Sequence, residues 1–226
     1  MEKSIWIVIP AYNESKKIAV VVTELKDAGF HNILVVDDGS RDATAEIAEK
    51  AGAEVLRHII NRGQGASLRT AIEYTNEHYR PDIIVTFDAD GQHQPSDIPH
   101  LIKPILEDRV DIVLGSRFLN HQTSLPFIRK VILKCGVLFT NTISNIKLSD
   151  THNGLRAMGR KAIDSIKIHH RGMEHASDII DEISKNKLVY TEVPVKIVYS
   201  EYSLRKGQKN FGFIKIGFKI LLKKML

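Results

Sequence analysis

The sequence predicts an α/β protein with a mostly parallel central sheet flanked by helices. Short apolar runs, typical of buried strands, alternate through the first half of the chain with segments of helical periodicity. The connections between them are short, which favours βαβ units. Several strands end in polar residues, and open α/β sheets bind ligands just beyond the carboxyl ends of their strands. We therefore expect a binding site at one edge of the sheet.

The expected elements follow in a regular order. Strands are predicted at residues 4–9, 33–36, 54–57, 83–87 and 111–115, and helices at 16–28, 42–50, 66–77 and 95–106. Gly29 suits a helix stop, and Ser40 or Asp42 suits an N-cap. After Arg117 the pattern changes: 125–147 is apolar but studded with Lys and Arg, and 150–158 reads as a loop and strand. A helix follows 172–174, and the alternating stretch 188–199 reads as strands interrupted by Pro194.

Composition narrows the class of protein. The 226 residues fit one large α/β domain with appendages, and a hydrophobic content of 43% is ordinary for a globular core. Cys135 is the only cysteine, which excludes an internal disulfide and suits a reducing compartment. No apolar run reaches the roughly 18 residues of a membrane span, and the first residues do not resemble a signal peptide.

The formal net charge of +5 fits an anionic ligand or a membrane surface as well as nucleic acid. We do not expect nucleic acid as a partner, because aromatic residues are few and only the last segment carries a dense basic face. In that segment, 211–226, Lys215, Lys219 and Lys223 recur every four residues, and apolar side chains cover most of the rest. This pattern predicts a basic amphipathic helix at a membrane interface, with docking on a protein core or partner as the alternative.

The stretch from Ile83 to Gln92 is the most informative in the chain. Its apolar run ends in Asp88, Asp90 and Gln92, whose oxygen atoms suit a hard divalent cation. This favours a metal–diphosphate site, and the alternative is a solvated acidic turn. Because other strands also end in polar groups (Asn13 and Glu14, Asp37 and Asp38, Arg117), we predict a nucleotide site along this edge.

The glycine-rich turn 61–65, which includes Gln64, leads into a predicted helix. It matches neither the dinucleotide-binding fingerprint nor a P-loop. Two interpretations remain open: a cradle for phosphate, or a tight loop whose glycines permit positive φ.

Taken together, these motifs resemble family 2 of the inverting glycosyltransferases, which have the GT-A nucleotide-binding fold. The resemblance covers nearly the whole chain and is greatest to polyprenyl-phosphate sugar synthases of the dolichol-phosphate mannose synthase type. The matching segments are Ile9-Pro10-Ala11-Tyr12-Asn13-Glu14, Val36-Asp37-Asp38-Gly39-Ser40, Asp88-Ala89-Asp90-Gly91-Gln92, Gly115-Ser116-Arg117 and 150–158.

The resemblance implies roles for particular residues. Those implied for nucleotide binding are Pro10, Tyr12, Glu14, Asp37, Asp38, Gln64, Asp88, Ala89 and Asp90. Asp88, Asp90 and Gln92 would hold Mg²⁺ or Mn²⁺. The implied catalytic residues are Asp88, Asp90, Arg117, Asp150 and Arg156, and those implied for the acceptor or a phosphate are Arg117, Asn153, Arg205, Lys206 and Lys209.

The resemblance also implies a reaction. A hexosyl or N-acetylhexosaminyl group would pass from a nucleotide-sugar, UDP-linked by analogy, to undecaprenyl phosphate, giving a lipid-linked monosaccharide for surface polysaccharide. The late loop Arg205-Lys206-Gly207-Gln208-Lys209 departs from the usual synthase pattern and resembles a bacterial surface-polysaccharide branch. The alternatives are transfer to a saccharide hydroxyl, with Glu174 or Asp150 as base, and a non-catalytic nucleotide-sugar-binding subunit.

The same resemblance suggests an organisation and a location. We expect a catalytic domain at 1–210, with a nucleotide-binding half (1–120) and an acceptor half (121–210), followed by the amphipathic helix 211–226. The chain would lie on the inner face of the cell membrane as a peripheral cytoplasmic protein. A small integral membrane protein and a second copy of the chain are the candidate protein partners.

Overall fold

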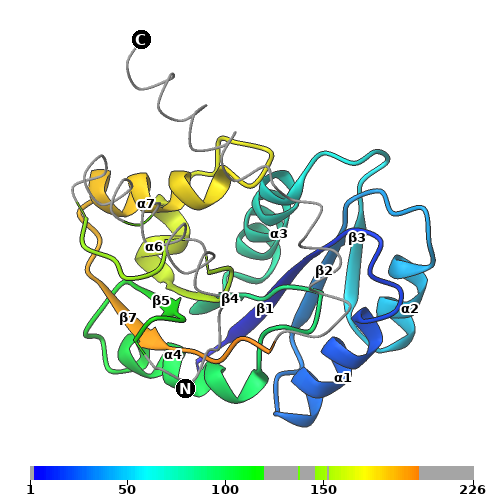
Figure 1. Ribbon diagram of the computed structural model, residues 1–226, viewed down its shortest axis with the longest axis horizontal. Coiled ribbons are helices and arrows are strands. Elements are labelled where there is room, and N and C mark those ends of the chain that lie inside the picture. The colour runs from blue at the N-terminus through cyan, green and yellow to red at the C-terminus, as the bar shows by residue number, and fades with distance from the viewer. Residues whose placement is uncertain (1–2, 120–136, 138–145, 152, 199–226) are drawn as a thin grey trace.

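A computed structural model describes residues 3–119, 137, 146–151 and 153–198 of the chain (Figure 1). These residues form one seven-stranded sheet with helices on both faces. The strands are β1 (Ile5–Ala11), β2 (Ile33–Asp37), β3 (Glu54–Arg57), β4 (Ile83–Thr86), β5 (Ile112–Ser116), β6 (Arg156–Gly159) and β7 (Tyr190–Pro194). The helices are α1 (Ile18–Asp27), α2 (Thr44–Lys50), α3 (Gln64–Tyr79), the 3₁₀ turn η1 (Pro95–Asp97), α4 (Ile98–Leu106), α6 (Arg160–Ser165) and α7 (His175–Lys185).

The strand order is β3-β2-β1-β4-β6-β5-β7, and only β6 runs antiparallel to its two neighbours. Thr86 at the end of β4 pairs with Arg156 at the start of β6. Because β6 is reversed, the residues that precede it lie at the same edge as the residues that follow β4. The predicted mostly parallel sheet is confirmed, and the reversed strand brings a late segment of the chain to its carboxyl edge.

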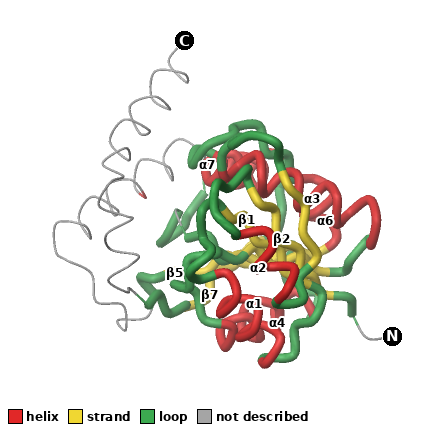
Figure 2. The backbone as a smooth tube through the Cα atoms, turned by 90° about the vertical axis from the view of Figure 1, so that its right-hand side faces the viewer, coloured by secondary structure: helices red, strands yellow, loops and turns green. Residues whose placement is uncertain are grey.

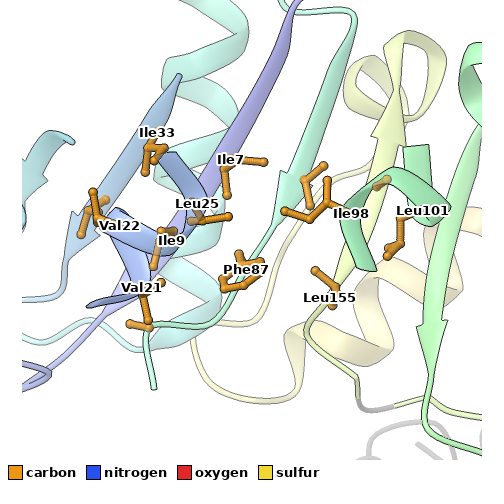
Figure 3. Close-up of a cluster of buried hydrophobic side chains, with 14 of the residues drawn as sticks. Ile7, Ile9, Val21, Val22, Leu25, Ile33, Phe87, Ile98, Leu101 and Leu155 are labelled. Atoms are coloured by element: carbon orange, nitrogen blue, oxygen red, sulfur yellow. The ribbon is translucent and has the colours of Figure 1, made fainter. Parts of the chain in front are cut away.

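Alternation along the strands builds two apolar layers. On β1, Ile7 and Ile9 face α1, α2 and α4, whereas Trp6 and Val8 face α3, α6 and α7. Figure 2 shows the two groups of helices on opposite sides of the sheet. Figure 3 shows the first layer, in which Phe87 packs among side chains of α1, α4 and the sheet. The central strands are buried on both faces, which explains their continuous apolar runs.

Some local details differ from the expectation. The sequence patterns do not predict α6, a helix of six residues. Neither Ser40 nor Asp42 is the N-cap of α2: the cap position is Ala43, although Asp42 Oδ1 accepts the Thr44 N–H (3.1 Å). Of the strands expected at 188–199, the described part, 188–198, contains only β7, which ends at Pro194, a residue without an N–H for the strand ladder.

The predicted stop after α1 is confirmed, since Gly29 adopts φ +90°. No helix within the described part of the chain is long and apolar enough to cross a membrane. The apolar, basic stretch 125–147 lies largely outside the described residues, and the tail 211–226 lies wholly outside them.

Helix α4 provides a test of the packing. Leu101 is fully buried in the layer beneath the sheet, and Leu106 of the same helix is 40% exposed. Leu101→Ala should lower the free energy of unfolding by about 2–5 kcal/mol, because it leaves a cavity. Leu106→Ala should change it by about 0.5 kcal/mol or less. Urea denaturation of both variants checks this, and equal losses would contradict the assigned burial.

Candidate functional site

The turn after β4 holds a carboxylate in a fixed position. Phe87 points into the apolar layer, so Asp88 points to the opposite face at the edge of the sheet. Gln64, at the start of α3, donates from Nε2 to Asp88 Oδ1 (3.2 Å). His93 lies 2.8 Å from Asp88 Oδ2 through its Nε2 atom. A carboxylate only accepts, so His93 Nε2 carries the proton. Asp88 therefore ties α3 to the turn that follows β4.

Residues before β6 complete the surroundings of Asp88. The Thr86 hydroxyl donates to the Gly154 carbonyl oxygen (2.6 Å). A Cβ atom on Gly154 would collide with the Asp88 carboxylate, so only glycine fits at this position. Burial alone raises the pKa of Asp88, but the charge and hydrogen bond of His93 and the charge of Arg156 outweigh it and leave the pKa lowered. Asp88, whose side chain is 29% exposed, is therefore an ionised carboxylate with fixed partners.

Asp90 is in the opposite electrostatic situation. Gly91 adopts φ +74°, which turns the chain so that the Gln92 N–H donates to Asp90 Oδ1 (3.0 Å). Burial and the nearby charge of Asp88 raise the pKa of Asp90 to about 6. The two carboxylates therefore hold more negative charge than their surroundings compensate. This charge would be relieved by a cation.

The donor set fits a divalent cation that brings other ligands with it. In the described part of the chain, no three His, Cys, Asp or Glu side chains lie close enough together to hold a metal ion. Asp88, Asp90 and Gln92 supply two carboxylates and an amide, and Gln92 is partly exposed. Mg²⁺ is usually held by one or two carboxylates, waters and substrate phosphates. The site therefore suits a cation bound together with an anionic ligand.

Three buried nitrogen atoms around Asp88 lack a hydrogen-bond partner. They are His93 Nδ1, Asn153 Nδ2 and Arg156 Nη1, and no other buried side-chain N or O atom among the described residues is left unpaired. Each of the three side chains is less than 5% exposed. Leaving such a group unpaired costs about 1–3 kcal/mol. Asn153 Nδ2 and Arg156 Nη1 carry N–H donors and therefore indicate a ligand that supplies oxygen atoms, whereas His93 Nδ1 is an acceptor when Nε2 carries the proton.

Arg156 and His175 lie near Asp88 and have shifted pKa values that set their charges. Burial lowers the pKa of Arg156 to about 10, although Asp88 and Asp150 oppose the shift, so the guanidinium stays protonated at neutral pH. Burial, and then the charge of Arg156, lower the pKa of His175 to about 4, so its imidazole is neutral. His175 Nδ1 donates to the Gly172 carbonyl oxygen (2.9 Å). Of these two residues, Arg156 therefore carries the positive charge near Asp88.

Arg117 follows β5 at the same edge and is held by Asp150. The pair is bidentate, with Nε to Oδ2 at 2.7 Å and Nη2 to Oδ1 at 2.8 Å. Asp150 is in turn fixed by its backbone N–H, which donates to Glu192 of β7 (3.1 Å). Burial raises the pKa of Glu192. Asp150 therefore orients Arg117, and its oxygens are already engaged.

Two buried carboxylates after β2 support the other half of the edge. Asp37 is fully buried and lies 3.2 Å from Arg57 Nε. Asp38 accepts the N–H groups of Arg62 (2.9 Å) and Gly63 (2.7 Å) and contacts His58 Nδ1 (2.7 Å). Because Asp38 accepts the N–H groups of Arg62 and Gly63, these two groups do not face a phosphate, which favours the tight-loop interpretation of the turn 61–65. Gly63 at φ +97° makes the turn sterically accessible.

The remaining predicted residues lie along β1 and the turn after β4, or outside the described chain. Pro10 is buried within β1, Tyr12 is partly exposed, and Glu14 is buried with its N–H bonded to Thr44 Oγ1 (2.8 Å). Ala89 is buried between the two aspartates of the turn. The predicted phosphate ligands Arg205, Lys206 and Lys209 lie outside the described residues.

Four residues of the site are absent from the sequence prediction. His93 lies five positions after Asp88 in the same turn, and this spacing was its only signal. Gly154 sits inside a matching motif, but its contact with Asp88 requires the reversed β6. His175 and Glu192 reach the site from α7 and β7 and have no local signal.

Comparison with known proteins gives concordant matches. The sequence profile described as "Glycosyl transferase family 2" matches residues 6–167. The chain is 35% identical to a UDP-N-acetylglucosamine–dolichyl-phosphate N-acetylglucosaminyltransferase of Methanococcus voltae, covering 99% of this chain and 97% of that protein. It is 30% identical to an undecaprenyl-phosphate mannosyltransferase of Micrococcus luteus, covering 86% and 83%.

A solved structure shares the architecture. Glucosyl-3-phosphoglycerate synthase from Mycobacterium tuberculosis, in complex with Mn²⁺, uridine diphosphate and glucosyl-3-phosphoglycerate, superposes with a TM-score of 0.67. The identity is 19%, and the match covers 90% of this chain and 74% of that chain. At this level of identity the likeness concerns the fold.

The raised pKa of Asp90 gives a test of the charge at this site. Its carboxyl has a pKa of about 6 in the folded chain against an ordinary value of 3.8, so its contribution to stability is fully present below 3.8 and is lost as the pH rises through about 6. Asp90→Asn should therefore stabilise the ligand-free protein by roughly 1–3 kcal/mol near pH 7.5, and the gain should shrink towards about pH 4.

Urea denaturation at both pH values measures this effect. Asp108→Asn is the matched control, because Asp108 is exposed at the opposite edge of the sheet, just after α4. A stabilisation by Asp90→Asn that is the same at both pH values would contradict the electrostatic assignment.

Proposed function

Because the chain belongs to glycosyltransferase family 2 and has its GT-A fold, we propose that it transfers a sugar from a nucleotide-sugar to a polyprenyl phosphate with inversion at the anomeric carbon. The two relatives are named for dolichyl phosphate and undecaprenyl phosphate, which supports a polyprenyl phosphate as acceptor. The Methanococcus relative is also named for a UDP-sugar, which supports UDP as the nucleotide. The sugar is a hexose or an N-acetylhexosamine.

One observation carries the proposal. Burial and the charge of Asp88 raise the pKa of Asp90, which favours a cation beside the two carboxylates, and the buried nitrogens of Asn153 and Arg156 have no hydrogen-bond acceptor among the described residues. A nucleotide-sugar bound with a divalent metal supplies both at once. Its metal offsets the charge of the carboxylates, and its phosphate and sugar oxygens accept from Arg156 and Asn153.

Asp90, with Asp88 and Gln92, is the proposed holder of Mg²⁺ or Mn²⁺. Both oxygens of Asp88 already bond Gln64 and His93, so Asp90 is the more available ligand. When bound, the metal would stabilise the leaving nucleoside diphosphate as a Lewis acid. Pro10, Tyr12, Glu14, Asp37 and Asp38, with Ala89, are the proposed wall of the nucleoside pocket.

The chain's own residues position the acceptor. Arg117, held by Asp150, is proposed to bind the acceptor phosphate and to stabilise negative charge. Arg205, Lys206 and Lys209 are proposed to assist it. A phosphate monoester has a second pKa of about 6 and is largely dianionic at neutral pH, so it attacks without a strong base.

This requirement separates the proposal from transfer to a sugar hydroxyl. A hydroxyl would need a general base, and Asp150 is bonded to Arg117 through both oxygens. Glu174, next to α7, is the remaining candidate base for that alternative.

We also propose that the chain works on the inner face of the membrane. The division into a nucleotide-binding half (1–120) and an acceptor half (121–210), with the tail 211–226 at the membrane interface, is part of this proposal. A small integral membrane protein or a second copy of the chain would act as partner. The two relatives come from an archaeon and a bacterium, so the polyprenyl phosphate chemistry supports the proposal more firmly than the bacterial polysaccharide branch.

An assay of sugar transfer tests the function. The full chain, incubated with UDP-N-acetylglucosamine or UDP-glucose and undecaprenyl or dolichyl phosphate, should form a lipid-linked monosaccharide only with Mg²⁺ or Mn²⁺. Asp90→Asn should lower the rate by about 100-fold or more, because charge stabilisation of the leaving group is lost. Asp108→Asn should leave it unchanged. Transfer to a glycan hydroxyl, with no lipid product, would refute the proposal.

Removal of residues 211–226 tests the proposed role of the tail at the membrane. The truncated chain should associate less with vesicles of anionic lipid, because a basic amphipathic helix binds through both its apolar and its cationic face. Co-sedimentation with liposomes measures this, and an unchanged bound fraction would contradict the role of the tail.

A further inference from the structure

Two adjacent isoleucines in the β3–α3 connection are exposed to solvent. Ile59 is 101% exposed and Ile60 is 68% exposed. Isoleucine is among the residues most often buried, so two such neighbours at one loop tip need an explanation. The other large apolar side chains among the described surface residues are all less exposed, the next being Val189 at 53%.

The exposure is imposed by firm anchors on either side. Before the isoleucines, the ring of His58 is held between Asp38 (2.7 Å) and Thr70 Oγ1 (3.0 Å). After them, the N–H groups of Arg62 and Gly63 donate to the same Asp38 carboxylate. The tip between these anchors is held at the sheet edge with both isoleucine side chains exposed.

A second turn lies against the first and adds to the exposed apolar surface. The Ala66 N–H donates to the Arg171 carbonyl oxygen (3.2 Å), and a Cβ atom on Gly63 would lie 3.0 Å from the Arg171 carbonyl carbon. Met173, two residues later, is 38% exposed. The side chains of Arg62 and Arg171 are exposed, and within the described residues neither is in an ion pair. We call Ile59, Ile60, Arg62, Arg171 and Met173 the loop-tip patch.

We propose that the loop-tip patch inserts its apolar side chains into the headgroup region of an anionic lipid bilayer. Apolar side chains flanked by arginines are the composition that binds such interfaces, where apolar burial and attraction to anionic lipid add together. The formal charge of +5 agrees with an anionic surface. This inference rests on the proposed function, because it supplies a surface that presents the protein to a lipid-borne acceptor.

The loop-tip patch lies at the same end of the sheet as the candidate site. The β3–α3 connection and the turn before α7 both lie at the end of the molecule towards which β1 and β3 point (Figure 1). Asp88 and Arg117 also follow the carboxyl ends of their strands. Insertion of the patch therefore turns the edge of the sheet that carries the candidate site towards the membrane.

A second protein copy is a poorer occupant. A standard protein interface buries roughly 800 Å² on each partner, which three apolar side chains on two loop tips do not provide. A lipid surface has no such requirement, since each inserted side chain contributes independently in proportion to its apolar area.

A fluorescent label at the tip tests the contact directly. In the full chain with Cys135→Ser, Ile59→Cys carries an environment-sensitive dye, and Val189→Cys at the opposite edge is the control. Vesicles of phosphatidylglycerol and phosphatidylcholine should raise and blue-shift the emission at position 59 and leave position 189 unchanged. No change at position 59, or an equal change at both, would overturn the proposal. The proposal would also be overturned if the emission at position 59 changed in the same way without vesicles, on addition of nucleotide-sugar alone or on raising the protein concentration.

Paired substitutions measure the contribution to binding. Ile59→Ser with Ile60→Ser should weaken co-sedimentation with these vesicles by about tenfold or more, and Leu106→Ser with Val189→Ser should not weaken it. Equal binding by both double variants would overturn the proposal.

An activity comparison separates this inference from the proposed function. The Ile59→Ser/Ile60→Ser variant should lose transfer to undecaprenyl phosphate in vesicles but keep transfer to a short, water-soluble polyprenyl phosphate. Loss on both acceptors would mean that the tip serves the site itself and would overturn the membrane role. If the unsubstituted chain transfers sugar to neither acceptor, the proposed function fails, and the vesicle measurements still decide the lipid contact.

Discussion

The Asp88 carboxylate is the point at which distant parts of this chain meet. Gln64 from the start of α3 and His93 from the turn after β4 each bond one of its oxygens. Gly154 lies against it so closely that no side chain fits, and Arg156 compensates its charge from β6. A charge that is partly removed from water is costly unless it is paired and hydrogen-bonded, so these contacts stabilise one another. The geometry of the pocket follows from that requirement.

The negative charge of the neighbouring Asp90 is less well compensated than that of Asp88. Asp88 takes up the partners that the protein provides, and Asp90 keeps a raised pKa beside it. The unpaired nitrogens of Asn153 and Arg156 have the complementary deficiency, because they lack acceptors. A site with uncompensated carboxylate charge and unpaired N–H donors suits a ligand that carries both a cation and anionic oxygens. The packed surroundings of the site hold these groups in position.

The sequence was sufficient to predict the fold class and the positions of the polar residues at the strand ends, whose roles in binding stay predictions. Apolar runs and helical spacing are local signals, so β1 to β5 and α1 to α4 could be predicted close to their bounds. Strand direction is a property of pairing between distant segments, so the reversal of β6 could not be read locally. The same limit applies to His175 and Glu192, whose contacts depend on α7 and β7. The turn 61–65 allowed two interpretations until its N–H groups were found bonded to Asp38.

The reversed β6 also has a consequence for the order of folding. Thr86 and Gly154, which bond each other, are 68 positions apart, so a chain being synthesised exposes the acidic turn long before its arginine arrives. Contacts of such high sequence separation form late, because loop closure must come first. Until β6 enters between β4 and β5, Asp88 has His93 from its own turn as a partner but lacks the charge of Arg156. The entry of β6 therefore completes the sheet and, in the same step, brings Gly154 and Arg156 to Asp88.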